Sequence, residues 1–276
     1  MFNGLMKAVT FSYDDGITQD QRLIEIFDKY GLKSTFNINS GLLGTPFSLN
    51  CDNVTVAHCK PRPDEVKKIY QNHEVAVHTL THPLLPELSD EEIIRQVEED
   101  RKALSEIVGY KVEGMAYPCG GVNNDDRVAE IIKNNTGVRF SRTITSTYNF
   151  DLQDNLYRFN PTVYHREKDA MERLAEEFLR LEPTEPKIFY IWGHSYEFER
   201  DNNWEVIERF AEKMGGKEDI WYATNIDIYD YIQDYNRLQV SVEGNYIYNP
   251  TARELFFAYG KSKTVYSVKP GESIKI

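Results

Sequence analysis

Short strand-like runs alternate with amphipathic helical segments along most of this 276-residue chain, and this alternation restricts its fold more than any other feature. The sequence predicts strands at residues 7–13, 35–38, 74–77, 112–117, 138–143, 187–192 and 220–223. Helical spacing and end signals predict helices near residues 23–30, after Pro63, from Ser89 to Gly109, and at 125–133, 168–181, 204–214 and 226–235. About seven β/α units of this kind predict a parallel sheet, closed or nearly closed, with its helices outside.

The pattern changes after Arg237. Short alternating runs follow, separated by turn residues, and their apolar members are Val240, Val242, Tyr246, Tyr248, Leu255, Phe257, Tyr259, Ile274 and Ile276. We therefore predict a main β/α domain over residues 1–236 and a small β-rich appendage over residues 237–276. The appendage is expected to cover exposed surface of the main domain; the alternative is carbohydrate binding through Tyr246, Tyr248 or Tyr259.

Net charge, apolar runs and cysteine content indicate which partners the protein can bind and in which compartment it is expected. The formal net charge is −12, from 32 basic and 44 acidic residues, which disfavours nucleic acid and other polyanions. No apolar run is long enough to span a bilayer, and residues 1–7 lack the pattern of a signal peptide, so we expect a cytoplasmic protein without a membrane partner. The three cysteines form no close pair and are expected to be reduced thiols.

Residues of the types that bind divalent metals follow the ends of several predicted strands. Asp14 and Asp15 come at the end of the first strand, His78 follows the third, and His194 follows the strand at 187–192. Because β/α barrels build their sites at the carboxyl ends of strands, we expect these residues to converge. His82 adds a second imidazole four residues after His78. Such a pair alone is more often structural, but beside two carboxylates it favours a metal-dependent hydrolase.

Four motifs occur in a fixed order: Thr10-Phe11-Ser12-Tyr13-Asp14-Asp15-Gly16, His78-Thr79-Leu80-Thr81-His82, Tyr117-Pro118-Cys119-Gly120 and Trp192-Gly193-His194. In this order they resemble the polysaccharide deacetylases with NodB homology, over about residues 5–235. The resemblance implies a distorted (β/α)7 barrel of the glycoside hydrolase and deacetylase type. It also implies metal-assisted removal of acetyl groups from sugars.

Carried over residue by residue, the resemblance makes Asp15, His78 and His82 the metal ligands and Asp14 the general base. His194 would be the general acid, and the backbone N–H of Cys119 would help to hold the oxyanion. One divalent ion is implied, Zn²⁺ first, with Co²⁺, Ni²⁺ or Mn²⁺ as alternatives. A nucleophilic role for Cys119 is rejected, because the metal pathway needs no covalent intermediate. The rival interpretation of His194 is a residue that caps the end of a buried strand.

The chain also departs from the family pattern. Many members carry an arginine two places before the proline of the third motif, where this chain has Ala116. Arg142, at the end of the next predicted strand, is our candidate to orient Asp14 in its place, against the alternative of an ordinary surface arginine. Cys119 stands where a tyrosine is usual. The aspartate-tryptophan motif of the family is not recognisable, and Asp151 and Asp154 lie only in its approximate region.

Other residues carry weaker expectations. His58, His73 and His165 are most simply surface or packing residues, with His165 as a further candidate for lining the cleft. Residues 145–164 lack a helical period and are rich in aromatic and polar side chains, so they are expected to form a long loop over the mouth of the barrel, as a lid or substrate wall.

Three functions remain open. The leading prediction is a metal-dependent hydrolase that removes N- or O-linked acetyl groups from an acetylated oligo- or polysaccharide. The second is an amidohydrolase that uses the same barrel and metal site on a small linear or cyclic amide. The third, from another class, is a carbohydrate-binding protein without catalytic activity.

Overall fold

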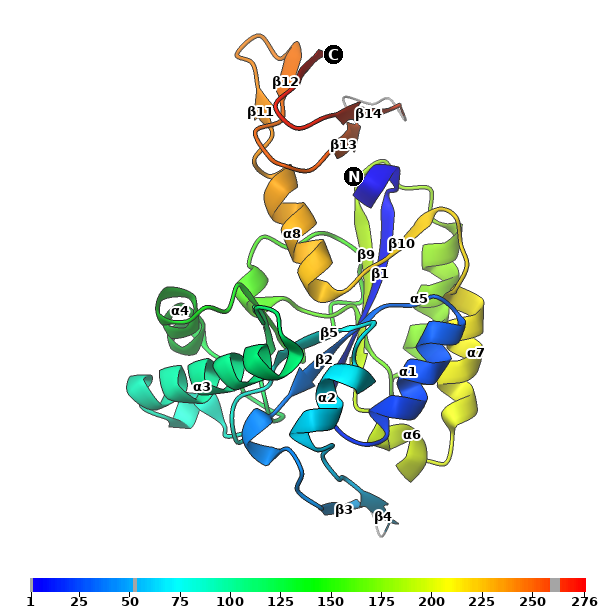
Figure 1. Ribbon diagram of the computed structural model, residues 1–276. Helices are drawn as coiled ribbons and strands as arrows, with labels where there is room; N and C mark the ends of the chain where they lie inside the picture. Colours follow the sequence, from blue (N-terminus) through cyan, green and yellow to red (C-terminus); the bar gives the residue numbers. More distant parts are fainter. Residues whose placement is uncertain (1, 52–53, 259–263) are drawn as a thin grey trace.

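The computed structural model describes residues 2–51, 54–258 and 264–276, and a curled parallel sheet forms its centre (Figure 1). The strands of this sheet are β1 (Lys7–Asp15), β2 (Ser34–Ile38), β5 (Glu74–Val77), β6 (Gly114–Ala116), β7 (Phe140–Arg142), β8 (Val163–Tyr164), β9 (Lys187–Gly193) and β10 (Ile220–Tyr222). Their order is β7-β6-β5-β2-β1-β9-β8, with β10 paired to β1, and every pairing is parallel. The predicted distorted barrel is confirmed.

Helices cover the sheet on its outer side. They are α1 (Asp20–Lys29), α2 (Pro63–Ile69), α3 (Asp90–Val108), α4 (Asp126–Asn135), α5 (Lys168–Arg180), α6 (Tyr196–Arg200), α7 (Trp204–Met214) and α8 (Asn225–Tyr235), with short 3₁₀ turns η1 (Phe2–Gly4), η2 (Ser40–Leu42), η3 (Leu85–Glu87) and η4 (Leu156–Arg158). Ser89 caps α3 by accepting the N–H of Glu92 at 3.3 Å, and Gly109 ends it with φ +82°. The side chain of Glu92 binds Arg95 and makes no hydrogen bond to the backbone N–H of Ser89, so the cap is not reciprocal.

The central strand β1 is buried along its whole length. One of its edges pairs with β9 over residues 7–13, while the other pairs with β10 at residues 7–9 and with β2 at residues 11–15. This register sets Asp14 beside Asn37 and Asp15 beside Ile38. Two carboxylates are therefore held at the carboxyl end of a fully buried strand.

The C-terminal tail forms the short strands β11 (Gln239–Val240), β12 (Tyr246–Tyr248), β13 (Leu255–Ala258), β14 (Val265–Val268) and β15 (Ser273–Lys275). A second apolar cluster lies around Phe2 and Tyr231, near the amino end of β1. The buried residues that the tail adds to this cluster are Ile247, Leu255, Phe257 and Val268. Tyr246 and Tyr248 are exposed, and Tyr259 lies outside the described residues. Their role in carbohydrate binding stays a prediction.

Two regions differ from the sequence expectation. An antiparallel hairpin, β3 (Ser48–Cys51) and β4 (Val54–Ala57), was not predicted, because most of its residues are at least partly exposed and give no clear apolar alternation. Figure 1 shows it at the end of the molecule away from the C-terminal tail. The segment 145–164 contains η4 and β8, and its Phe150, Leu156 and Phe159 are buried, so it packs on the barrel instead of forming an open lid.

Within the described residues, no helix combines the length and apolar character needed to cross a bilayer. Cys51, Cys59 and Cys119 are all free thiols.

Candidate metal centre and active site

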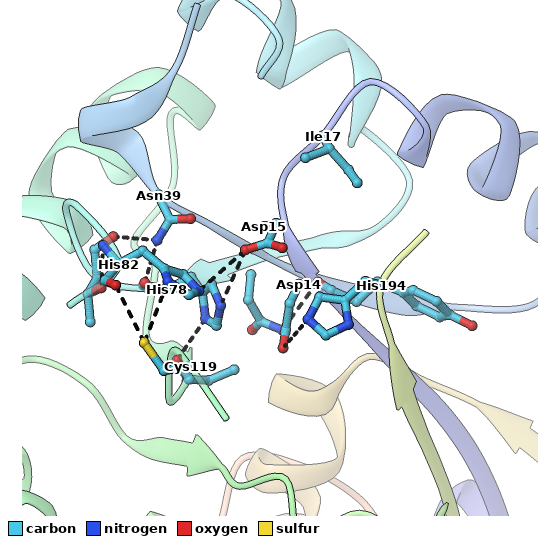
Figure 2. Close-up of polar contacts among 12 residues, drawn as sticks. Asp14, Asp15, Ile17, Asn39, His78, His82, Cys119 and His194 are labelled. Atoms are coloured by element: carbon cyan, nitrogen blue, oxygen red, sulfur yellow. Dashed lines mark hydrogen bonds and ion pairs between the residues drawn. The ribbon is translucent and has the colours of Figure 1, made fainter. Parts of the chain in front are cut away.

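The residues singled out from the sequence converge at the carboxyl ends of the central strands (Figure 2). Asp14 and Asp15 end β1, His78 follows β5, and His194 follows β9. Figure 2 shows His78 and His82 on the side of Asp15, with His194 on the side of Asp14. All five line one cavity of about 810 Å³. The structure therefore brings together the residues that follow the ends of β1, β5 and β9, with His82 beside His78.

Three of these side chains direct their ligand atoms toward one another. Oδ1 of Asp15 lies 3.4 Å from Nε2 of His82 and 3.8 Å from Nε2 of His78, and the three atoms lie within 4.8 Å of one another. Nδ1 of His78 lies 3.0 Å from the carbonyl oxygen of Ala116, so this nitrogen carries the proton and Nε2 is the atom left for a metal. Burial lowers the pKa of His78 to about 4, which keeps the ring neutral at pH 7. One carboxylate and two neutral imidazoles fit a zinc-like ion.

The backbone around these ligands is strained. Positive φ angles of +83°, +67°, +63° and +68° occur at Asp15, Thr79, His82 and Cys119. Such conformations cost about 1–3 kcal/mol each and cluster at functional sites. Gly16 follows with φ +57°, and a Cβ there would lie 2.8 Å from Cγ1 of Ile38. The glycine of the first motif is therefore needed to let the chain turn directly after the two aspartates.

The main chain at His78 is fixed from two sides by residues that the sequence did not single out. Asn39 donates from Nδ2 to the carbonyl oxygens of His78 and, at 2.9 Å, of Thr79. Asp100, in α3, accepts the N–H of His78 at 3.1 Å and the N–H of Ser40 at 2.6 Å. No sequence motif marks these contacts, because they depend on how α3 and η2 pack against the sheet.

Asp14 has a different set of partners. Arg142 donates from Nη2 to both carboxylate oxygens, and Asn37 donates to Oδ1 at 2.8 Å. Burial alone would raise the pKa of Asp14, but the charge and hydrogen bonds of Arg142, together with the charge of His194, lower it below the usual value. The carboxylate is therefore ionised at neutral pH. Its Oδ2 lies 3.9 Å from Nε2 of His194.

Arg142 reaches Asp14 from the neighbouring strand. It lies directly opposite Ala116 in the parallel register of β6 and β7. Its side chain is fully buried, lies 4.7 Å from the ring centre of Trp192, and donates from Nη1 to the carbonyl oxygen of Thr143 at 3.1 Å. Arg142 thus contacts the carboxylate of Asp14, as the sequence hypothesis requires. Its effect on turnover stays a prediction.

His194 is paired with Glu197, a residue that sequence reasoning missed. Nδ1 of His194 lies 3.3 Å from Oε2 of Glu197, which also accepts the backbone N–H of His194. Burial would lower the pKa of His194, but the hydrogen bond and charge of Glu197, together with Asp15 and Asp14, raise it to about 9. The imidazole is therefore protonated at pH 7. Glu197 follows His194 by three residues, a spacing that brings two side chains together at the start of a helix, and this was the signal in the sequence that could have found it.

Asp151 and Asp154, the sequence candidates for the unrecognised aspartate-tryptophan motif, do not occupy this position. Both are exposed, and Asp151 pairs with Lys187 at 2.6 Å outside the cavity. Glu197 is the buried carboxylate beside His194 instead.

Cys119 lies against His82. Its Sγ is 3.7 Å from Nδ1 of His82 and 3.6 Å from the carbonyl oxygen of the same residue. Burial raises the pKa of the thiol, with Asp15 and Glu87 adding to the effect, so it is protonated at neutral pH. This agrees with the rejection of Cys119 as a nucleophile. The proposed role of its backbone N–H stays a prediction.

His58 does more than pack at the surface. It is 8% exposed, and its Nε2 donates to Oδ2 of Asp15 at 3.0 Å. Lys60, which the sequence did not mark, donates from Nζ to the carbonyl oxygen of Asp15 and lies 4.0 Å from Oδ1. Burial opposes ionisation of Asp15, but the His58 hydrogen bond and the Lys60 charge hold the pKa of this carboxyl well below its usual range.

His165 and His73 are buried and structural in character. His165 lies behind His194, with Nδ1 3.2 Å from the hydroxyl of Tyr13 and Nε2 3.0 Å from Glu197, and it does not line the described cavity. A Cβ at Gly193 would lie 2.2 Å from its ring, which explains the glycine of the fourth motif. His73 accepts the N–H of Ser34 and lies 3.3 Å from Asp28, remote from the site.

The walls of the cavity are largely apolar. Residues 42–49 supply one side, including Phe47, whose side chain remains 57% exposed. Further apolar and aromatic wall residues are Ile144, Tyr164, Trp192 and Tyr196. Of the segment 145–164, Tyr164 alone lines this cavity, so the expected lid contributes one aromatic wall residue.

The first half of the chain matches a known protein family. The family model for polysaccharide deacetylases matches residues 3–140, which is half of the chain. The peptidoglycan-N-acetylmuramic acid deacetylase PdaC of Bacillus subtilis (strain 168) is 25% identical over 124 residues, covering 44% of this chain. These residues span 23% of the length of that relative.

Solved structures share the fold at low sequence identity. A candidate polysaccharide deacetylase from Mycobacterium smegmatis aligns with a TM-score of 0.59 and 13% identity, over 84% of this chain and 92% of that chain. The T48 deacetylase, solved with substrate, aligns with a TM-score of 0.52 and 17% identity, over 83% of this chain and 94% of that chain. With the family model matched over half of its length and the fold shared with these structures, the chain belongs to the polysaccharide deacetylase family.

Proposed function

We propose that this protein is a metal-dependent hydrolase that removes N- or O-linked acetyl groups from an acetylated oligo- or polysaccharide. The proposal rests most on one observation: an ionised Asp14 and a protonated His194 face each other 3.9 Å apart beside a cluster of three ligand-type side chains. Hydrolysis of an acetyl group needs one residue that takes a proton and another that gives one. The negative net charge favours a neutral or cationic saccharide as the substrate.

Asp15, His78 and His82 would hold the metal through Oδ1 and the two Nε2 atoms. When bound, a Zn²⁺ ion or a similar divalent metal supplies Lewis acidity at the acetyl carbonyl and lowers the pKa of water. The neutral state of His78 and the hydrogen bond from its Nδ1 to Ala116 support this assignment, because metal binding requires a free and oriented Nε2.

Asp14 takes the proton of the attacking water. Arg142 and Asn37 supply three hydrogen bonds to its carboxylate, which fix its orientation. The same contacts keep Asp14 ionised in spite of burial, so it can accept a proton at pH 7. A base of this kind contributes about 10²–10⁴-fold to the rate.

His194 gives a proton to the leaving amine or alcohol as the tetrahedral intermediate collapses. Its Nδ1 is held by Glu197, so Nε2 is the atom that faces Asp14 and the cavity. The backbone N–H of Cys119, on the turn with φ +68°, is the proposed donor to the oxyanion.

Two other functions compete with this proposal. An amidohydrolase acting on a small linear or cyclic amide could use the same base, acid and ligand set. A carbohydrate-binding protein without catalytic activity is disfavoured, because binding alone gives no reason to bury a charged base and a charged acid side by side.

Metal analysis of the purified protein, combined with an acetate-release screen, tests the proposal. The substrates are acetylated oligomers of glucosamine, xylose and mannose, and Asp14→Asn is the control. We expect stoichiometric divalent metal, acetate release by the wild type, and loss of release in the variant. Release of ammonia or ring opening from amides would favour the amidohydrolase, whereas tight sugar binding without metal or hydrolysis would favour the binding protein.

A further inference from the structure

The two carboxylate oxygens of Asp15 have different surroundings. Oδ1 faces Nε2 of His82 at 3.4 Å and Nε2 of His78 at 3.8 Å. Oδ2 points the other way and accepts a hydrogen bond from Nε2 of His58 at 3.0 Å. His58 therefore binds Oδ2, whereas His78 and His82 both face Oδ1.

The ring of His58 is itself held in place by the residue before β3 and by the first residue of α6. It makes edge-on contacts with Phe47, at 6.1 Å between ring centres, and with Tyr196, at 5.3 Å. The backbone N–H of His58 donates to the carbonyl oxygen of Phe47 at 2.8 Å. Because the imidazole is buried and packed on two sides, its Nε2 reaches Asp15 without a large loss of side-chain freedom.

The segment that carries His58 is also tied to the turn after β1. The N–H of Thr18 donates to the carbonyl oxygen of Cys59 at 2.9 Å, and Gln19 donates from Nε2 to that of Ala57 at 2.7 Å. Lys60 binds the carbonyl oxygen of Asp15 itself. Residues 57–60 thus follow the turn 15–19 closely and hold both its main chain and its carboxylate.

We propose that His58 is a positioning residue for the metal ligand Asp15. By donating to Oδ2, His58 leaves Oδ1 as the single oxygen directed at His78 and His82, and it prevents the carboxylate from rotating out of that orientation. The inference rests on the proposed metal site. A partner of this type matters because losing it leaves the buried Oδ2 without a hydrogen bond and the ligand without a fixed geometry.

Two variants separate the hydrogen bond from the packing. His58→Phe keeps the ring between Phe47 and Tyr196 but removes the donor, whereas His58→Gln keeps an N–H donor and removes the ring. Cys59→Ala is the matched control on the neighbouring residue. The Sγ of Cys59 contacts the carbonyl oxygen of Phe47, so removing it leaves the hydrogen bonds of Asp15 in place. If His58→Phe does not fold, His58→Leu serves as the variant without a donor.

The measurement is Zn²⁺ affinity by competition with a chromophoric chelator, with circular dichroism as the check on folding. We expect His58→Phe to bind Zn²⁺ about 10–100-fold more weakly than the wild type. His58→Gln should recover most of the lost affinity, and Cys59→Ala should bind as the wild type does. Acetate release by His58→Phe should be low at limiting Zn²⁺ and recover at saturating Zn²⁺.

Wild-type affinity in His58→Phe would overturn the inference, as would an equal loss in His58→Phe and His58→Gln. Either result can occur while the wild type binds Zn²⁺ and releases acetate, and the proposed function would then stand. Failure of the wild type itself to bind any divalent metal would instead refute the proposed metal site and this inference together.

Discussion

Asp14 and Asp15 are consecutive residues, but one is held by the sheet and the other by loops. Asn37 and Arg142, the partners of Asp14, belong to β2 and β7. The groups around Asp15 come from the segments that follow β4 and β5, and they are His58, Lys60, His78 and His82. The sheet therefore fixes the proposed base, while loops assemble the proposed metal site around the next residue.

This difference matters because the two carboxylates need different chemistry. Asp14 is neutralised by a buried guanidinium, so its charge is balanced by the protein alone. Asp15 faces two histidines across a space that a cation can fill, and its other oxygen binds a third histidine. Changes on each side of the pair should accordingly have separable effects on proton transfer and on metal binding.

The largest effect is expected from exchanging each carboxylate for an amide. Asp15→Asn should lose both Zn²⁺ binding and acetate release, because it removes a charged ligand. Asp14→Asn should retain Zn²⁺ while its turnover falls by at least about 10²-fold, since only the base is lost. Metal content and kcat, measured on both variants, check this. Loss of metal from Asp14→Asn alone would reverse the two assignments.

Arg142→Met is expected to have the next largest effect, on stability as well as on turnover. It leaves Asp14 buried without its cation, which should lower the free energy of unfolding by about 3–5 kcal/mol. Arg139→Met is the matched control, because Arg139 is partly exposed and its ion pairs with Glu113 and Asp230 should contribute about 1 kcal/mol or less. Urea denaturation gives both values, and equal losses would show that Asp14 does not depend on Arg142.

The pH dependence of turnover tests the acid beside Asp14. His194 has a raised pKa of about 9, so its proton is present below that pH and is lost as the pH rises through it. We expect kcat/KM to fall above about pH 9 in the wild type. Glu197→Gln should move this upper limit down toward the ordinary histidine value of about 6.5.

Glu199→Gln, an exposed substitution on the same helix, is the control for that profile and should leave it unchanged. An upper limit that does not move in Glu197→Gln would assign the titration to a group other than His194.

The smallest effect is expected at Phe47, which lines the cavity directly before β3. Phe47→Ala should raise KM several-fold with little change in kcat, because it removes contact with the substrate that is the same in the ground and transition states. Tyr246→Ala, an exposed aromatic in the tail, should leave KM for short oligosaccharides unchanged. A rise of KM in Tyr246→Ala would support carbohydrate binding by the appendage.

The difference between the sheet residues around Asp14 and the loop residues around Asp15 explains what could be predicted from the sequence. Residues at strand ends, such as Asp14, His78 and His194, could be placed together because a parallel sheet aligns its carboxyl ends. Arg142 could be proposed for the same reason, since it lies one strand away from Ala116. His58 and Lys60 could not, because they reach Asp15 through a hairpin without clear apolar alternation, and their contacts depend on tertiary packing.

The most direct test of the central claim is a crystal structure of the protein grown with Zn²⁺, with anomalous data collected at the zinc edge. We predict one strong peak about 2.0–2.2 Å from Oδ1 of Asp15 and from Nε2 of His78 and His82. Asp14 should remain bound to Arg142 and outside the coordination sphere. A peak coordinated by Asp14, or no peak between the two histidines, would contradict the account.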